Sequence, residues 1–137
     1  MLNVEIKTIP HNQHRYPTVG DYFYNFDAEK IKTIIHVSDM KNESYEFLVS
    51  IHEQIEEFLT RLRGISEDSI TAFDINFEKN RKDEDFSEPG NDPKAPYFKE
   101  HQFATIIEKF IALELGVDWN IYDETICRLD DSPECGS

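Results

Sequence analysis

The spacing of the apolar residues changes near residue 40, and this change constrains the fold more than any other feature of the sequence. Before it, Leu2, Val4 and Ile6 alternate with polar residues, and residues 21–26 and 31–37 are rich in aromatic and β-branched side chains. Both patterns are typical of β-strands. After it, apolar residues recur every three or four positions, as in amphipathic helices. Strands followed by helices predict an α+β fold.

Residues 1–40 are predicted to form an antiparallel sheet of about three strands. The short segment 27–30 between the second and third strands favours a hairpin. A longer polar connection, bracketed by Pro10 and Pro17, joins the first strand to that hairpin.

Residues 42–129 are predicted to be mostly helical, with a bundle of three to four helices. Capping residues and helix-ending glycines set the boundaries. They predict helices from Asn42 or Ser44 to Arg63, from Glu67 to Arg81, from near Tyr97 to just before Gly116, and a short one after Asp118. Residues 82–96 hold three of the six prolines and are predicted to be a loop, either a connector or a lid. One domain is expected over residues 1–129, with a polar tail at 130–137.

The net charge of the chain limits the kinds of partner that it can bind. Asp and Glu number 28 against 14 Lys and Arg, for a net charge of −14. Such a chain is repelled by nucleic-acid phosphates and by anionic membranes, so we expect neither as a direct partner. The acidity fits cation binding, a basic protein partner or simple solubility.

The termini and cysteines predict a soluble, cytoplasmic protein. The N-terminus lacks a basic start followed by an apolar run, and no apolar segment approaches a membrane span. Cys127 and Cys135 do not form a framework of paired cysteines, which favours a reducing compartment.

The first long helix carries a possible pair of metal ligands. His52 and Glu56 are four residues apart, so they are neighbours on one flank of its apolar stripe. An imidazole and a carboxylate at that spacing can share one cation. Glu53 lies further round the helix, and Glu57 is expected to face away. The stripe expected to face the core is Leu48, Ile51, Ile55, Phe58, Leu59 and Leu62.

The next two helices repeat this arrangement of polar residues beside an apolar stripe. Asp74 and Glu78 flank Ile70, Phe73 and Phe77 in one, whereas His101 and Glu108 flank a predicted core of Phe103, Ile106, Ile107 and Phe110 in the other. Glu100 and Glu114 point nearer to the apolar side, where a buried carboxylate needs a partner.

These flanks predict one metal site if the helices bring them together. His52, Glu56 and His101 would be the core ligands, with Glu108, Asp74 or Glu78 completing or supporting the shell. Imidazole and carboxylate ligands suit zinc, manganese or iron. Glu53 would be the catalytic general base. The alternative is that each flank is a solvated face or an internal hydrogen-bond network.

Two local resemblances bear on this site. The segment His52-Glu53-x-x-Glu56 resembles the H-E-x-x-H helix of zinc metallopeptidases, in which the outer residues hold zinc and the Glu activates water. Glu56 stands here where that family has its second His. The acidic pairs also resemble, more weakly, the magnesium sites of all-α nucleotide pyrophosphohydrolases, although Asp74 and Glu78 are spaced by four rather than three.

The chain as a whole resembles a group of small, uncharacterised bacterial and phage proteins. The resemblance is carried by "RYPTVGD", "IHEQIEEF", "RGISED", "AFDINFE", "EPGNDPKAPYFKEHQFAT" and "ELGVDW". It implies a cytoplasmic protein of bacterial or phage origin and transfers no activity. The leading functional prediction is therefore a divalent-metal-binding protein, more finely a metal-dependent hydrolase. The alternative is a non-catalytic acidic binding protein, bacterial or phage-encoded, that engages a protein partner or a small ligand.

Overall fold

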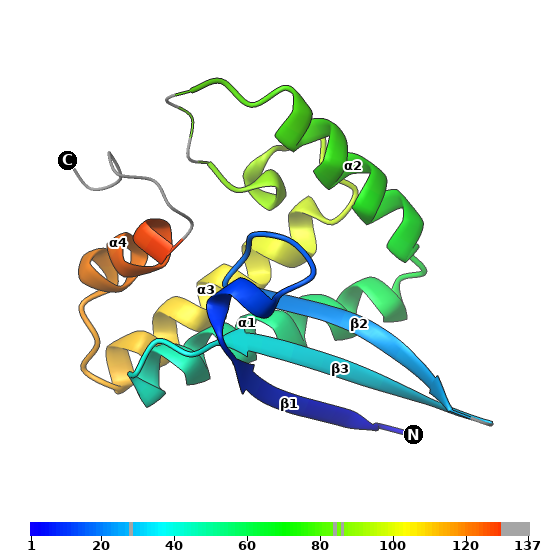
Figure 1. The fold of residues 1–137 in the computed structure, drawn as a ribbon, viewed down its shortest axis with the longest axis horizontal. Coiled ribbons are helices and arrows are strands. Elements are labelled where there is room, and N and C mark those ends of the chain that lie inside the picture. The colour runs from blue at the N-terminus through cyan, green and yellow to red at the C-terminus, as the bar shows by residue number, and fades with distance from the viewer. Residues whose placement is uncertain (28, 84, 86, 130–137) are drawn as a thin grey trace.

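The computed structural model describes residues 1–27, 29–83, 85 and 87–129, so the predicted tail at 130–137 lies outside the described residues. It shows a three-stranded sheet followed by four helices, which confirms the α+β class (Figure 1). The strands are β1 (Val4–Ile9), β2 (Gly20–Asp27) and β3 (Lys30–Ser38). The helices are α1 (Glu43–Leu62), α2 (Glu67–Lys79), α3 (Phe98–Glu114) and α4 (Trp119–Leu129), and the 3-10 turns are η1 (His11–Gln13) and η2 (Pro89–Asn91).

The sheet is mixed, with strand order β1-β3-β2. β2 and β3 form the predicted antiparallel pair. β1, however, runs parallel to β3, with Val4 opposite Thr33 and Ile9 opposite Ser38, so the prediction of an entirely antiparallel sheet is wrong for this strand. Residues 10–19 are long enough to cross two strand spacings, roughly 10 Å. β3 can therefore fold back between β1 and β2.

Local sequence chemistry sets the helix boundaries largely as predicted. The Asn42 side chain caps α1 by accepting a hydrogen bond from the Tyr45 amide, and Ser66 caps α2 through the Ser69 amide. Gly64 follows α1 with a φ of +69°, a conformation that favours glycine. α2 ends at Lys79, two residues before the predicted end.

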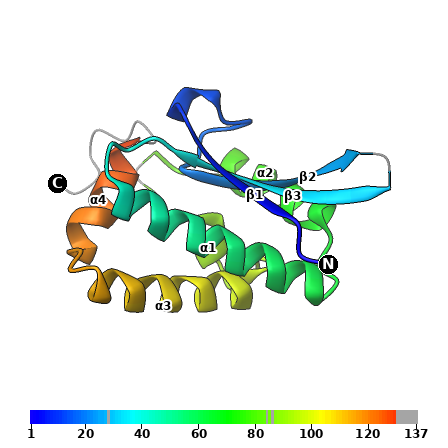
Figure 2. The ribbon, with the colours of Figure 1, turned by 90° about the horizontal axis from the view of Figure 1, so that it is seen from below.

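The helices stack on the sheet in layers. α1 packs on β2 and β3, and α3 lies beside α1 on its outer side (Figure 2). Arg63 at the end of α1 pairs with Glu100 at the start of α3, whereas His52 pairs with Glu108 further along, so the two helices are antiparallel. The small apolar core consists of Ile35, Val37, Leu48, Val49, Ala112 and Tyr122.

The predicted inward-facing stripes of α1 and α3 are largely wrong. Leu48 is buried, but Phe58 and Leu62 on α1 are exposed. Phe103, Ile106 and Phe110 on α3, which were expected to be core residues, are also exposed. The reason is that the sheet and the facing helix cover the polar sides of these helices. Donors there reach the buried carboxylates of Glu56, Glu57, Glu100 and Glu108.

Glu57 shows how a polar side of a helix is stabilised when it faces inward. It was expected to face away, yet it is buried on the sheet side of α1. Arg61 donates to it at 2.7 Å and the Tyr24 hydroxyl at 3.1 Å, which compensates the loss of water around the carboxylate. Glu100 is likewise buried, and the partner expected for it is Arg63. Glu114, which was also expected to lie nearer to the apolar side, is exposed.

None of the described helices has the length and apolar character needed to cross a membrane.

Candidate metal centre

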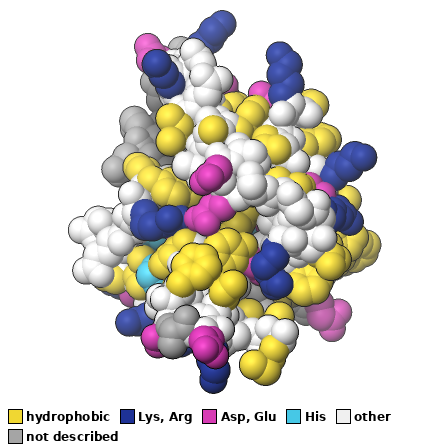
Figure 3. Space-filling view, turned by 90° about the vertical axis from the view of Figure 1, so that its right-hand side faces the viewer, with side chains coloured by type: hydrophobic (Ala, Val, Ile, Leu, Met, Phe, Trp, Pro, Cys, Tyr) yellow, Lys and Arg dark blue, Asp and Glu magenta, His cyan; other side chains and the backbone are white. Residues whose placement is uncertain are grey.

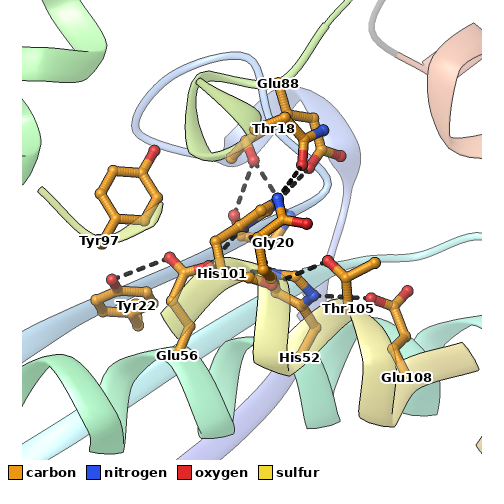
Figure 4. Close-up of polar contacts among 12 residues, drawn as sticks. Thr18, Gly20, Tyr22, His52, Glu56, Glu88, Tyr97, His101, Thr105 and Glu108 are labelled. Carbon is orange, nitrogen blue, oxygen red and sulfur yellow. Dashed lines mark hydrogen bonds and ion pairs between the residues drawn. The ribbon is translucent and has the colours of Figure 1, made fainter. Parts of the chain in front are cut away.

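Three ligand-type side chains meet between α1 and α3. His52 and Glu56 come from α1 and His101 from the first turns of α3, and all three are buried (Figure 4). The His52 Nε2 atom lies 3.1 Å from Glu56 Oε2 and 3.2 Å from His101 Nδ1. The third side, from His101 Nδ1 to Glu56 Oε2, measures 2.9 Å.

The size of this triangle is close to that required around one metal ion. Four ligands bound to zinc at about 2.0–2.1 Å in a tetrahedron are roughly 3.3–3.4 Å apart. The observed separations of 2.9–3.2 Å fall slightly below that value. Without an ion, a shared proton can hold the same three atoms together.

The other polar atom of each side chain is in contact with a further group. Nδ1 of His52 lies 2.8 Å from Glu108, and Nε2 of His101 lies 3.0 Å from Glu88, which approaches it as an ion pair. The Tyr22 hydroxyl donates to Oε1 of Glu56 at 3.1 Å. The three atoms that face one another, His52 Nε2, Glu56 Oε2 and His101 Nδ1, are therefore not the ones that contact these outer residues. Outer partners of this kind orient metal-binding side chains in known sites.

Glu108 is itself fixed by a third helix. The hydroxyl of Tyr122, a fully buried residue of α4, donates to Glu108 Oε2 at 2.6 Å. A continuous chain of contacts thus runs from α4 through α3 to His52 on α1, which restricts rotation of that imidazole.

The charges of the cluster reinforce one another. Burial disfavours protonated imidazoles, but hydrogen bonds to Glu108 and Glu56 outweigh it and raise the pKa of His52. Burial likewise opposes charging His101, yet Glu56 and Glu88 raise its pKa to about 9. Burial would raise the pKa of Glu56, but its hydrogen bonds to both imidazoles lower it instead. The site therefore favours positive charge at its centre.

Glu53 lies beside the cluster against the sheet. A Cβ atom built on Gly20 of β2 would lie 2.8 Å from Glu53 Oε1 and 2.7 Å from a Val49 methyl, so the close approach of strand and helix requires glycine there. Burial and the charge of Glu56 raise the pKa of Glu53 well above its ordinary value. The carboxylate is thus near the ligands without being one of the three atoms.

The 3-10 turn η2 in the loop before α3 covers the His101 ring. Gly90 in η2 packs so closely that a Cβ there would lie 2.5 Å from Cγ of the imidazole. The adjacent Asn91 accepts a hydrogen bond from the Gln102 side chain at 2.9 Å. Pro89–Asn91 belongs to the predicted loop 82–96, so this part of the loop packs on the cluster.

The structure brings together only some of the predicted site residues. Asp74 accepts a hydrogen bond from the Tyr97 hydroxyl at 2.6 Å, outside the three-atom cluster. Glu78 is exposed and pairs with Arg81 at 2.8 Å. Glu108 contacts the outer nitrogen of His52 rather than the centre. The spacing of Asp74 and Glu78 placed them on one helix face but could not show where α2 docks.

The sequence patterns did not indicate the outer partners Glu88, Tyr22 and Tyr122. Glu88 lies in the Pro-rich loop upstream of His101, so its position was the one available clue. Nothing in the local pattern distinguishes the two tyrosines from ordinary core aromatics. No family model, curated protein or solved structure matches this chain.

Proposed function

We propose that this protein binds one divalent cation through His52 Nε2, Glu56 Oε2 and His101 Nδ1. The proposal depends chiefly on one observation: these atoms lie 2.9–3.2 Å apart, while the remaining polar atom of each side chain contacts another residue. Outer partners of this kind hold metal-binding side chains in one orientation, and here they leave three potential ligand atoms directed at a common point.

The ligand set favours zinc, manganese or iron over calcium and magnesium, because imidazole nitrogen suits the first group. Two histidines and one carboxylate leave coordination positions for water or substrate, as in catalytic zinc and iron sites. We therefore propose a metal-dependent hydrolase as the finer function. The cation would supply the activation of water.

Glu53 is the proposed general base in this hydrolase. It follows His52 directly on α1 and lies against β2, close to the ligands but free of the triangle they form. A bound cation would lower the raised pKa of Glu53 and favour its ionised form, which would accept the proton from the attacking water. Tyr22 and Glu108 would keep Glu56 and His52 oriented. The substrate class is left unassigned.

Metal analysis of untagged protein purified without chelators tests the binding site. About one zinc, manganese or iron ion per chain is expected in the wild type. His52→Ala should lose it, and so should Glu56→Gln, with circular dichroism confirming that each variant is folded. His36→Ala is the matched control, since it removes an imidazole on β3 that lies outside the cluster.

Absence of metal from wild-type protein, together with no thermal shift on adding these ions, would refute the metal site. The cluster would then be an internal hydrogen-bond network, and the acidic binding protein would become the leading alternative.

The hydrolase proposal has a separate test. Glu53→Gln should retain the metal yet lose turnover in a screen of phosphate-ester, carboxyl-ester and peptide substrates. A variant that keeps full activity, or one that loses the metal, would show that Glu53 is not the base.

A further inference from the structure

The exposed sides of α1 and α3 carry large apolar residues, and we call them together the apolar face. They are Phe47, Ile51, Ile55, Phe58 and Leu62 on α1, and Phe103, Ile106, Ile107, Phe110 and Leu113 on α3. The exposed fractions are 47% for Phe47, 42% for Phe58, 68% for Leu62, 49% for Phe103, 51% for Ile106, 67% for Phe110 and 77% for Leu113. The three remaining isoleucines are half-buried.

Except at Phe47, which lines a hollow together with Ile6 and Val37 of the sheet, the apolar face lies on the side of the helix pair away from the sheet and the metal cluster. The sheet and the cluster occupy the opposite arc of each helix, where Glu56, Glu57, Glu100 and Glu108 are buried. In Figure 2, α3 is the outermost layer of the molecule on this side. A helix pair with its carboxylates inside and its phenylalanines outside is the reverse of the arrangement expected for a monomer in water.

The size of the face matches that of a stable interface. Large apolar side chains present about 150–250 Å² each, so seven that are roughly half exposed offer on the order of 700 Å². A standard interface buries about 800 Å² per partner, and the largest patch on a typical monomer is about 300–600 Å². By comparison, the end of the molecule that carries α2 shows hydrophobic side chains interspersed with Lys and Arg (Figure 3).

We propose that a second copy of this chain covers the apolar face, so that two antiparallel α1–α3 pairs form a four-helix bundle across a two-fold axis. A two-fold interface brings the same patch from both copies together, which suits a face built of two matching apolar stripes. A basic partner is disfavoured, since all ten residues of the face are uncharged. This inference does not depend on the proposed metal site.

The net charge of −14 predicts an unusual salt dependence. Two copies repel each other through their charges, and salt screens this repulsion while leaving apolar contact intact. The dimer should therefore tighten as salt is added. A complex with a basic protein would weaken instead.

Sedimentation equilibrium of the full chain at low and high salt tests the proposal. The wild type should have twice the chain mass of 16.1 kDa. Phe110→Glu and Leu113→Glu should each raise the dimer dissociation constant roughly a hundredfold or more, because a charge would be buried in the interface. Ile75→Glu is the matched control: it places the same charge on α2, at a residue that is 64% exposed and outside the face.

A wild-type mass of one chain in both salts would overturn the dimer. So would an unchanged dimer in the Phe110 and Leu113 variants, or equal dissociation by Ile75→Glu. If Phe110→Glu fails to fold, Leu113→Glu still decides the question, since that side chain contributes least to the packing of the single chain.

Discussion

At the scale of single residues, Glu108 determines which nitrogen of His52 faces the centre of the cluster. Its contact with Nδ1 leaves Nε2 directed toward Glu56 and His101. Tyr122 in turn holds Glu108, so the orientation of the His52 imidazole depends on two residues that lie outside the three-atom cluster.

Replacing Glu108 should weaken metal binding without abolishing it. Glu108→Gln removes the negative charge beside His52, and loss of such an outer partner typically costs about 10–100-fold in metal affinity. Competition with a metal-sensitive dye would measure the change. Glu78→Gln, at an exposed carboxylate paired with Arg81, should leave the affinity unaltered; equal effects of the two variants would contradict the assigned role.

Gly90 is predicted to be intolerant of even one methyl group. In Gly90→Ala the new Cβ would lie 2.5 Å from the His101 ring, so either η2 or the imidazole must move. We expect metal affinity and thermal stability to fall together.

Gly64→Ala provides the comparison for Gly90. It introduces a methyl at a φ of +69° with no neighbour within 4 Å, so it should cost roughly 1 kcal/mol through the backbone alone. Its metal affinity should be normal. Unimpaired metal binding by Gly90→Ala would show that η2 does not position His101.

At the scale of secondary structure, α2 is the described helix that has no fully buried residue. One link from α2 to the start of α3 is the hydrogen bond that the Tyr97 hydroxyl donates to Asp74. Asp74 is half-buried, and this partial loss of water raises its pKa to about 6, although the bond to Tyr97 opposes the shift. The folded state therefore holds a proton on Asp74 more tightly than the unfolded chain does.

This shift predicts a contribution to stability that falls as pH rises. A carboxyl with a raised folded-state pKa stabilises the fold while protonated and loses that stabilisation as pH passes from about 4 to above 6. The side chain of the Asp74→Asn variant cannot titrate. Its free energy of unfolding relative to that of the wild type should therefore be higher at about pH 7.5 than at about pH 5, by on the order of 1 kcal/mol after allowance for solvent screening. Urea denaturation at both pH values would measure the difference; a constant difference would contradict the raised pKa.

At the scale of the whole molecule, metal binding and folding should be coupled. The cluster joins α1 to α3, and its outer partners come from β2, α4 and the loop before α3, so a bound cation would link most of the fold. A ligand at about 100 times its dissociation constant stabilises a protein by roughly 2.7 kcal/mol.

Removing the metal should therefore lower the melting temperature of the wild type by on the order of 10 °C. Differential scanning calorimetry with and without chelator would measure this shift. His52→Ala should melt at the same temperature in both conditions. A chelator effect of equal size in that variant would place the stabilising metal elsewhere.

The sequence alone was sufficient for the features that depend on neighbouring residues. Strand and helix segments, the caps at Asn42 and Ser66, and the glycine after α1 follow from contacts within a few positions of the chain. So does the pairing of His52 with Glu56, because residues four apart in a helix are always neighbours. The sequence also predicted that His101 joins this cluster and that a partly buried Glu100 needs a partner, which is Arg63.

Only the tertiary structure decided which parts of the chain meet. The parallel pairing of β1, the outward apolar stripes of α1 and α3, and the contacts of Glu88, Tyr22 and Tyr122 all join segments distant in sequence. Periodicity shows that a helix has two unlike faces but not what covers each one. Here the polar side is covered by the sheet, by the His–Glu cluster and by donors such as Arg61, Arg63 and Tyr24. Which side of each helix faces inward depended on pairing all the buried carboxylates with donors at once. This is a property of the assembled fold and not of any single helix.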